Sequence, residues 1–132
     1  MILSKRAIKQ AIARGKLQIT PYADAHIEAA HINLHLSTGA DQALVVGPRA
    51  FVTARTVEKI TLSSDLCGFM EGRASLAKLG ISTEQSSTFV EPGSDNTLTL
   101  EIFNASQQPV TLESGQPIAK LILMPVLNNL GT

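Results

Sequence analysis

The sequence has little cysteine and little charge, and each shortage excludes a class of protein. A single cysteine, Cys67, cannot form an intrachain disulfide and fits a reducing compartment. Only 17% of the 132 residues are charged, against roughly 25% in an average soluble domain. Part of the surface is therefore expected to face a partner, and self-association is the plainest cause. Lysine plus arginine equals aspartate plus glutamate, at 11 each, which argues against bulk electrostatic binding of nucleic acid.

Long hydrophobic runs are missing as well. No apolar stretch approaches the roughly 20 residues that span a bilayer, so we expect no membrane association. The first residues, Met1 to Arg6, hold no apolar run of the signal-peptide type, so we expect no secretion by that route and a cytoplasmic or virion location. Hydrophobic residues still make up 44% of the chain. This content supports one core, and we expect a single domain over residues 1–132.

Charge is unevenly distributed along the chain. Residues 1–23 carry basic side chains and no acidic one: Lys5, Arg6, Lys9, Arg14 and Lys16. Residues 84–132 are mainly acidic: Glu84, Glu91, Asp95, Glu101 and Glu113, against Lys120. We interpret the basic segment as a solvated helix whose charge is offset by the far end of the chain or by a neighbour. The alternative is a basic patch for phosphates or an acidic partner.

The beginning of the chain has the pattern of one short amphipathic helix. Ser4 is a good N-cap and Gly15 a good helix end, and between them apolar residues recur at helical spacing. These apolar positions are Ala7, Ile8, Ala11 and Ile12.

Beyond the helix the pattern changes to short strands. Residues 97–104 are the strongest of them, with Leu98, Leu100 and Ile102 on the face that should be buried. Residues 74–79 should form a short helix or turn, and residues 22–30 are ambiguous. Many short strands with regular turn signals predict an all-β barrel or sandwich. The strands are expected at 17–19, 32–36, 44–46, 51–56, 57–62, 66–70, 97–104, 110–113 and 118–124.

Two histidines, His31 and His35, raise the question of a metal. On a helix their spacing can hold an ion. The flanking alternation favours a strand, where they lie about 13 Å apart at roughly 3.3 Å per residue. Neither has an acidic or cysteine partner at ligand spacing, so we expect no intrachain metal site; a site on a symmetry axis, with one histidine per subunit, stays open. Cys67 lies in an apolar stretch and is interpreted as a small buried hydrophobe.

Several segments, in order along the chain, resemble motifs of the dCTP deaminase and dUTPase superfamily. The strongest is EGRASLAKLG at residues 71–80, similar to the family's G-R-S-S-L-A-R-L-G. VEPG at 90–93, LTLEIFN at 98–104 and GQPIAKL at 115–121 resemble I-D-P-G, I-x-L-E-x-x-N and G-x-x-I-A-Q-L. The resemblance implies a distorted β-barrel or jelly-roll subunit with a short N-terminal helix. It also implies a homotrimer with sites where subunits meet, and we expect leucine and valine side chains near its threefold axis.

If the chain is a deaminase, it keeps one of the family's catalytic side chains and replaces two others. The resemblance places Glu101 at the glutamate that activates water. The family's serine falls on Ala74, which has no hydroxyl, and its arginine falls on Lys78, which lacks the planar fork. The loss of one transition-state donor costs roughly 10²–10³ in rate. The zinc deaminase signature is absent, because it needs more than one cysteine.

Read as a diphosphatase, the chain is altered too. The family's metal-holding aspartate falls on Asn33, a poorer Mg²⁺ ligand, and its water-orienting aspartate falls on Glu91. Ser94 replaces the aromatic that packs on the nucleoside, and Lys120 replaces a phosphate-binding glutamine but can meet a phosphate as a point charge. The resemblance keeps Arg73 in place and leaves the Ser75 hydroxyl nearby; both, with Lys78 and Lys120, are candidate phosphate-binding residues. Residues 125–132 hold no glycine-rich or basic segment, so we expect no lid over a triphosphate.

These changes define the functional hypotheses. We favour a family member that keeps the trimer and loses the reaction, used as a binding or structural module such as a regulator or a capsid-decorating trimer of a virus. The alternative is an active dCTP deaminase or dUTP diphosphatase, with Glu101 and Glu91 as catalytic residues and Mg²⁺ arriving only with the nucleotide. A third hypothesis is a nucleotide sensor without turnover. No other cofactor is expected.

Overall fold

The computed structural model describes residues 1–86, 88–128 and 130. Within these residues the elements follow one another as α1 (Lys5–Ala13), β1 (Leu17–Thr20), η1 (Asp24–His26), β2 (Ile32–Ser37), β3 (Leu44–Val46), β4 (Phe51–Leu62), β5 (Leu66–Gly72), α2 (Ala74–Ala77), β6 (Ile81–Ser82), β7 (Phe89–Val90), β8 (Asp95–Asn104), β9 (Val110–Leu112) and β10 (Pro117–Pro125). The all-β prediction is therefore confirmed. No helix in the described part of the chain is long and apolar enough to cross a membrane.

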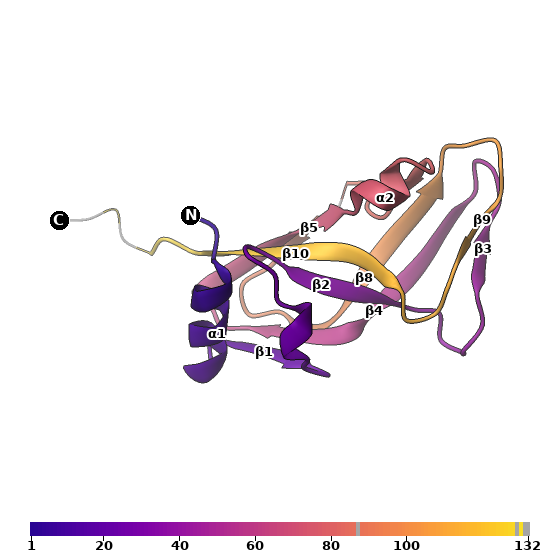
Figure 1. Ribbon diagram of the computed structural model, residues 1–132. Helices are drawn as coiled ribbons and strands as arrows, with labels where there is room; N and C mark the ends of the chain where they lie inside the picture. Colours follow the sequence, from indigo (N-terminus) through magenta and orange to yellow (C-terminus); the bar gives the residue numbers. More distant parts are fainter. Residues whose placement is uncertain (87, 129, 131–132) are drawn as a thin grey trace.

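The strands form one curled antiparallel sheet and a small ribbon. The sheet runs β6-β8-β4-β2-β10-β5-β7, with β1 added to β4, and β3 pairs with β9 separately. In Figure 1, α1 and β1 lie at one end of the molecule and the β3–β9 ribbon at the other. Because β2 and β10 lie at the middle of the strand order, residues 33 and 120 come side by side although they are far apart in the sequence.

The N-terminal helix forms as its sequence predicts. Ser4 Oγ accepts a hydrogen bond from the Ala7 amide at 3.2 Å, which satisfies one of the free N–H groups of the first turn. Gly15 ends the segment with φ +72°, a conformation that suits glycine. Ile8 and Ala11 are buried against the sheet, so one face of α1 closes the end of the core.

Period-two alternation explains how the strands build the core. On β8, Leu98, Leu100 and Ile102 are buried, as expected, and the residues between them are not. The patterns of β2 and β10 alternate in the same way. Each of these strands therefore has one apolar face against the core and a second face available for a site.

One expectation was wrong. Residues 51–56 and 57–62 are a single strand, β4. The sequence suggested a break because Thr56 and Glu58 occupy inward positions while Val57, 39% exposed, faces out. Thr56 Oγ1 donates to the Glu58 carbonyl at 2.8 Å and accepts from the Leu98 amide at 2.9 Å. These bonds replace ladder bonds where the register with β8 shifts between Arg55 and Lys59.

Short elements account for the remaining differences. The ambiguous stretch 22–30 contains η1, and the two-residue strands β6 and β7 had no distinct pattern in the sequence. The predicted helix at 74–79 is the single turn α2.

Candidate functional site

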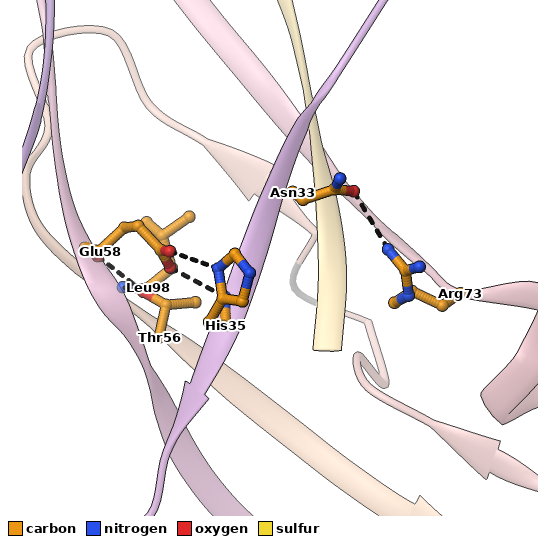
Figure 2. A network of polar contacts seen from close by, with 6 residues as sticks. All are labelled: Asn33, His35, Thr56, Glu58, Arg73 and Leu98. Carbon is orange, nitrogen blue, oxygen red and sulfur yellow. Dashed lines mark hydrogen bonds and ion pairs between the residues drawn. The ribbon is translucent and has the colours of Figure 1, made fainter. Parts of the chain in front are cut away.

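Arg73 and Asn33 meet on the outward face of the sheet. Arg73 Nη1 donates to Asn33 Oδ1 at 3.1 Å, as Figure 2 shows. Arg73 directly follows β5 and keeps an extended backbone, φ −97° and ψ 136°, before α2 begins. Both side chains are half-buried. The bond leaves most of the donors of the guanidinium free for an anion.

Asn33 connects several polar groups. His31 Nε2 lies 3.1 Å from Asn33 Oδ1, and Asn33 Nδ2 donates to Glu28 Oε1 at 3.4 Å. Lys120 is directly opposite Asn33 across the β10–β2 pair, and directly opposite residues share a sheet face. Two cations, Arg73 and Lys120, thus lie on either side of the Asn33 amide, and the exposed Glu71 is directly opposite Lys120 on β5. The two cations are the groups of this cluster that could bind phosphate oxygens.

Three motif residues lie on or beside α2: the changed Ala74 and Lys78 and the retained Ser75. Ala74, Ser75 and Lys78 are all exposed, and Leu76 is the residue that anchors the turn in the core. The Ser75 hydroxyl and the Lys78 ammonium are therefore accessible. Ala74 presents only a methyl group next to Arg73.

Glu101 lies on β8, half-buried, and is held in one orientation. Its Oε1 accepts the Gln85 backbone N–H at 3.2 Å, and its own N–H donates to the Thr83 carbonyl at 2.9 Å. The segment 83–85 therefore packs against the strand that carries Glu101.

Glu91 and Ser94 share a tight turn after β7. Ser94 Oγ donates to the Glu91 carbonyl at 2.5 Å. Both residues line a surface hollow of about 350 Å³ between this turn, β4 and β8. Arg55 lines the same hollow, where Nε and Nη2 donate to the Thr97 hydroxyl and carbonyl, both at 2.6 Å.

Arg55 is a site residue that sequence reasoning missed. Its guanidinium also donates to Thr99 Oγ1 at 2.9 Å, and within the described residues no carboxylate neutralises it. A fixed cation thus lies in a hollow that also holds Glu91. In the sequence, the only signal is an arginine in one strand and threonines at alternate positions, 97 and 99, of another. That pattern is common on solvated sheet faces.

The predicted site residues form three groups. Asn33, Arg73 and Lys120 lie together; Glu91 and Ser94 share the hollow; Glu101 is held by the 83–85 segment. No hydrogen bond or ion pair joins Glu101 to Arg73 or to Glu91 in the part of the chain that the structure covers. The expectation about residues 125–132 concerns positions 129, 131 and 132, which lie outside the described residues.

The structure gives His35 partners that sequence spacing did not reveal. Glu58 Oε1 accepts the His35 backbone N–H at 2.9 Å, and Glu58 Oε2 lies 2.6 Å from His35 Nδ1 (Figure 2). The His26 ring is 4.2 Å from the His35 ring, centroid to centroid. Spacing along the sequence could not predict this cluster, because His26, His35 and Glu58 come from three different elements, η1, β2 and β4.

Comparison with known proteins identifies the family. The family model described as dCTP deaminase-like matches residues 38–126. The "dCTP deaminase, dUMP-forming" of Aquifex aeolicus (strain VF5) is 32% identical over 147 residues, covering 92% of this chain and 80% of that protein. The enzyme of the same name from Mycobacterium avium (strain 104) is 32% identical over 152 residues, covering 94% and 80%. The chain therefore belongs to the dCTP deaminase-like family.

Solved structures agree on the fold. The 2'-deoxycytidine 5'-triphosphate deaminase from Agrobacterium tumefaciens aligns with a TM-score of 0.76 at 18% identity, covering 92% of this chain and 47% of that one. This chain thus spans about half the length of that protein. The native EIAV dUTPase aligns with a TM-score of 0.66 at 20% identity, covering 88% and 92%. The predicted superfamily and its β fold are confirmed, and the named relatives are enzymes.

Proposed function

We propose that this chain binds a deoxypyrimidine nucleoside triphosphate and deaminates dCTP. The observation that carries the proposal is Glu101, retained, half-buried and oriented by the Gln85 N–H. Arg73 and Lys120 supply positive charge for the phosphates. The similarity to deaminases at about 30% identity supports this reading over loss of the reaction, which we favoured from the sequence.

The chemistry requires two bond exchanges if the product is dUMP, as the relatives' names state. Glu101 takes a proton from water as the water oxygen bonds to C4 of cytosine. It then passes that proton to the 4-amino nitrogen, the C4–N bond breaks, ammonia leaves, and the 4-hydroxyl form of the base tautomerises to uracil. A second water attacks the α-phosphorus, and diphosphate leaves. Glu91, on the hollow, is our candidate for orienting that water, and Mg²⁺ would arrive on the triphosphate. Ser75 and Lys78, both exposed beside Arg73, are further candidates for phosphate contacts.

Self-association into a homotrimer is part of this proposal. Phe69 and Phe89 are 36% and 44% exposed, with ring centroids 5.2 Å apart. Ile122 is directly opposite Phe69 on β10, so an apolar patch lies on the outward face. Together with the low charged fraction, this patch suits burial between copies. Light scattering should give three times 14.0 kDa; a mass of one chain would refute the trimer.

A second candidate function is a binding or structural module without turnover, as a regulator, nucleotide sensor or capsid-decorating trimer. Ala74 favours it, because its methyl beside Arg73 cannot donate a hydrogen bond to the substrate. Ser94 also favours it, since a serine in the hollow offers no stacking surface. A cytoplasmic location suits the first candidate and a virion location the capsid variant.

Turnover with dCTP and with dUTP, each with Mg²⁺, separates the two candidates. Release of ammonia from dCTP that Glu101→Gln abolishes supports the deaminase. Glu91→Gln tests the diphosphate step by the same assay with diphosphate detection. No release with either nucleotide, with heat of binding by calorimetry, supports the sensor. If neither product release nor heat of binding is detected with either nucleotide, the structural module is the remaining candidate.

A further inference from the structure

A cluster of His26, His35 and Glu58 lies at the sheet and has no part in the proposed reaction. One nitrogen or oxygen atom from each residue lies within 4.8 Å of those of the other two. Glu58 is 3% exposed, and both histidines are half-buried. Their donor atoms therefore converge in a place that solvent reaches only in part.

We infer that these three residues bind one divalent transition-metal ion of the zinc class. Two imidazoles and one carboxylate form a donor set typical of zinc, with a fourth position left for water. Imidazole nitrogens disfavour Mg²⁺ and Ca²⁺, which prefer all-oxygen sites. Tetrahedral zinc with bonds near 2.0–2.1 Å places its ligands about 3.4 Å apart, so small side-chain rotations bring the three atoms to ligand distance.

Electrostatics support a cation at this point. A buried carboxylate requires a charged or hydrogen-bonding partner. Within the described residues, the only ion pair of Glu58 is with His35, 2.6 Å between Oε2 and Nδ1. A metal ion would take over that role, with His35 Nδ1 as one of its ligands.

The protein already holds the three residues close to their bound positions. Asp24, which begins η1, accepts from Lys9 Nζ at 2.7 Å and from the Tyr22 hydroxyl at 3.0 Å, which fixes the turn carrying His26. Glu58 binds the His35 backbone N–H at 2.9 Å. An ion would therefore connect η1 to β2 and β4. His26 is two residues before Glu28, which accepts a hydrogen bond from Asn33, so the ion would lie close in sequence to the Asn33 group.

The experiment uses tag-free protein and zinc itself. Competition with a chromophoric chelator should give one Zn²⁺ per chain for the wild type, and excess Mg²⁺ should not displace it. The His26→Ala variant should bind at least about tenfold more weakly. The matched control is His31→Ala, since the chain has 3 histidines and His31 is the one outside the cluster.

A second readout tests the same site by stability. Zn²⁺ should raise the melting temperature of the wild type and of His31→Ala, and not that of His26→Ala, whose native circular dichroism spectrum is checked first. Bound Co²⁺ should show the visible absorption of a nitrogen- and oxygen-ligated tetrahedral ion. Absence of stoichiometric Zn²⁺ binding by the wild type, or equal affinity in wild type and His26→Ala, would overturn the site. Neither result depends on nucleotide turnover.

Discussion

Ala74 is the single residue whose chemistry differs most from what the proposed deamination needs. Its methyl group is exposed beside Arg73, where a hydroxyl could donate to developing charge. We expect Ala74→Ser to raise the ammonia-release rate from dCTP by up to roughly 10²-fold, the scale of one transition-state donor. The measurement is kcat against wild type at saturating dCTP.

The matched control for this substitution is at Ala77, one helical turn after Ala74 in α2. Ala77→Ser adds the same hydroxyl at an exposed position of α2 and should leave the rate unchanged. If both variants show the same rate as wild type, a donor at position 74 has no role in the reaction.

Asn104 is a buried polar residue whose side-chain hydrogen bonds should contribute to the stability of the fold. It is fully buried, its Nδ2 donates to the Val46 and Gln108 carbonyls at 3.0 and 2.8 Å, and its Oδ1 accepts the Ser106 N–H at 2.9 Å. We expect Asn104→Ala to lower the free energy of unfolding by about 2–4 kcal/mol, because buried polar groups lose their partners. Urea denaturation measures it. Asn96→Ala, at an exposed position of β8, should cost less than about 0.5 kcal/mol.

At the scale of elements, surface ion pairs connect segments far apart in sequence. Lys16 Nζ donates to Asp65 Oδ2 at 2.8 Å, which joins the segment after α1 to the β4–β5 turn. This bond, and a second from Ser63, hold the pKa of Asp65 below its usual 3.8. A depressed pKa stabilises the fold above 3.8, and that stabilisation is lost as the pH falls through the folded-state pKa.

Asp65→Asn should therefore reduce the acid sensitivity of the fold. The fall in melting temperature between neutral pH and pH below 3.8 should be smaller in this variant than in the wild type, and added salt should shrink the difference. Asp41→Asn is the control, an exposed carboxylate with no ion pair in the described ranges. An unchanged acid profile in Asp65→Asn would contradict the role of the pair.

The elements also show what the sequence could and could not predict. α1 and β8 were predictable because cap, end signal and alternation all agreed with burial. β4 was divided wrongly because the inward Thr56 and Glu58 are polar, and their partners on β2 and β8 are set by tertiary pairing. The His26–His35–Glu58 cluster and the hollow lined by Arg55 could not be predicted for the same reason, since tertiary pairing brings their residues together. Sequence spacing cannot reveal contacts between strands whose order is set only by the complete sheet.

In the whole molecule, the site residues are distributed over several elements, and an apolar patch lies on the outward face of the sheet. Glu101, Glu91 and the Arg73–Asn33 pair lie in three groups. A substrate would have to reach all three groups, either within one chain or with a second copy supplying part of the site. The exposed Phe69 and Phe89 favour the second copy, since sheet-face aromatics are efficient anchors of interfaces.

Phe69→Glu should therefore dissociate the assembly and abolish turnover together. A charge placed in a buried apolar interface is costly unless it is paired, so light scattering should show the 14.0 kDa chain with native circular dichroism. Ammonia release should fall to background, because the proposed site is shared between copies of the chain. Val45→Glu, at an exposed position of the β3–β9 ribbon, adds the same charge away from the patch and should keep both mass and activity. Full activity in a monomeric Phe69→Glu protein would mean that one chain carries the entire site, and the three groups would then have to close within it.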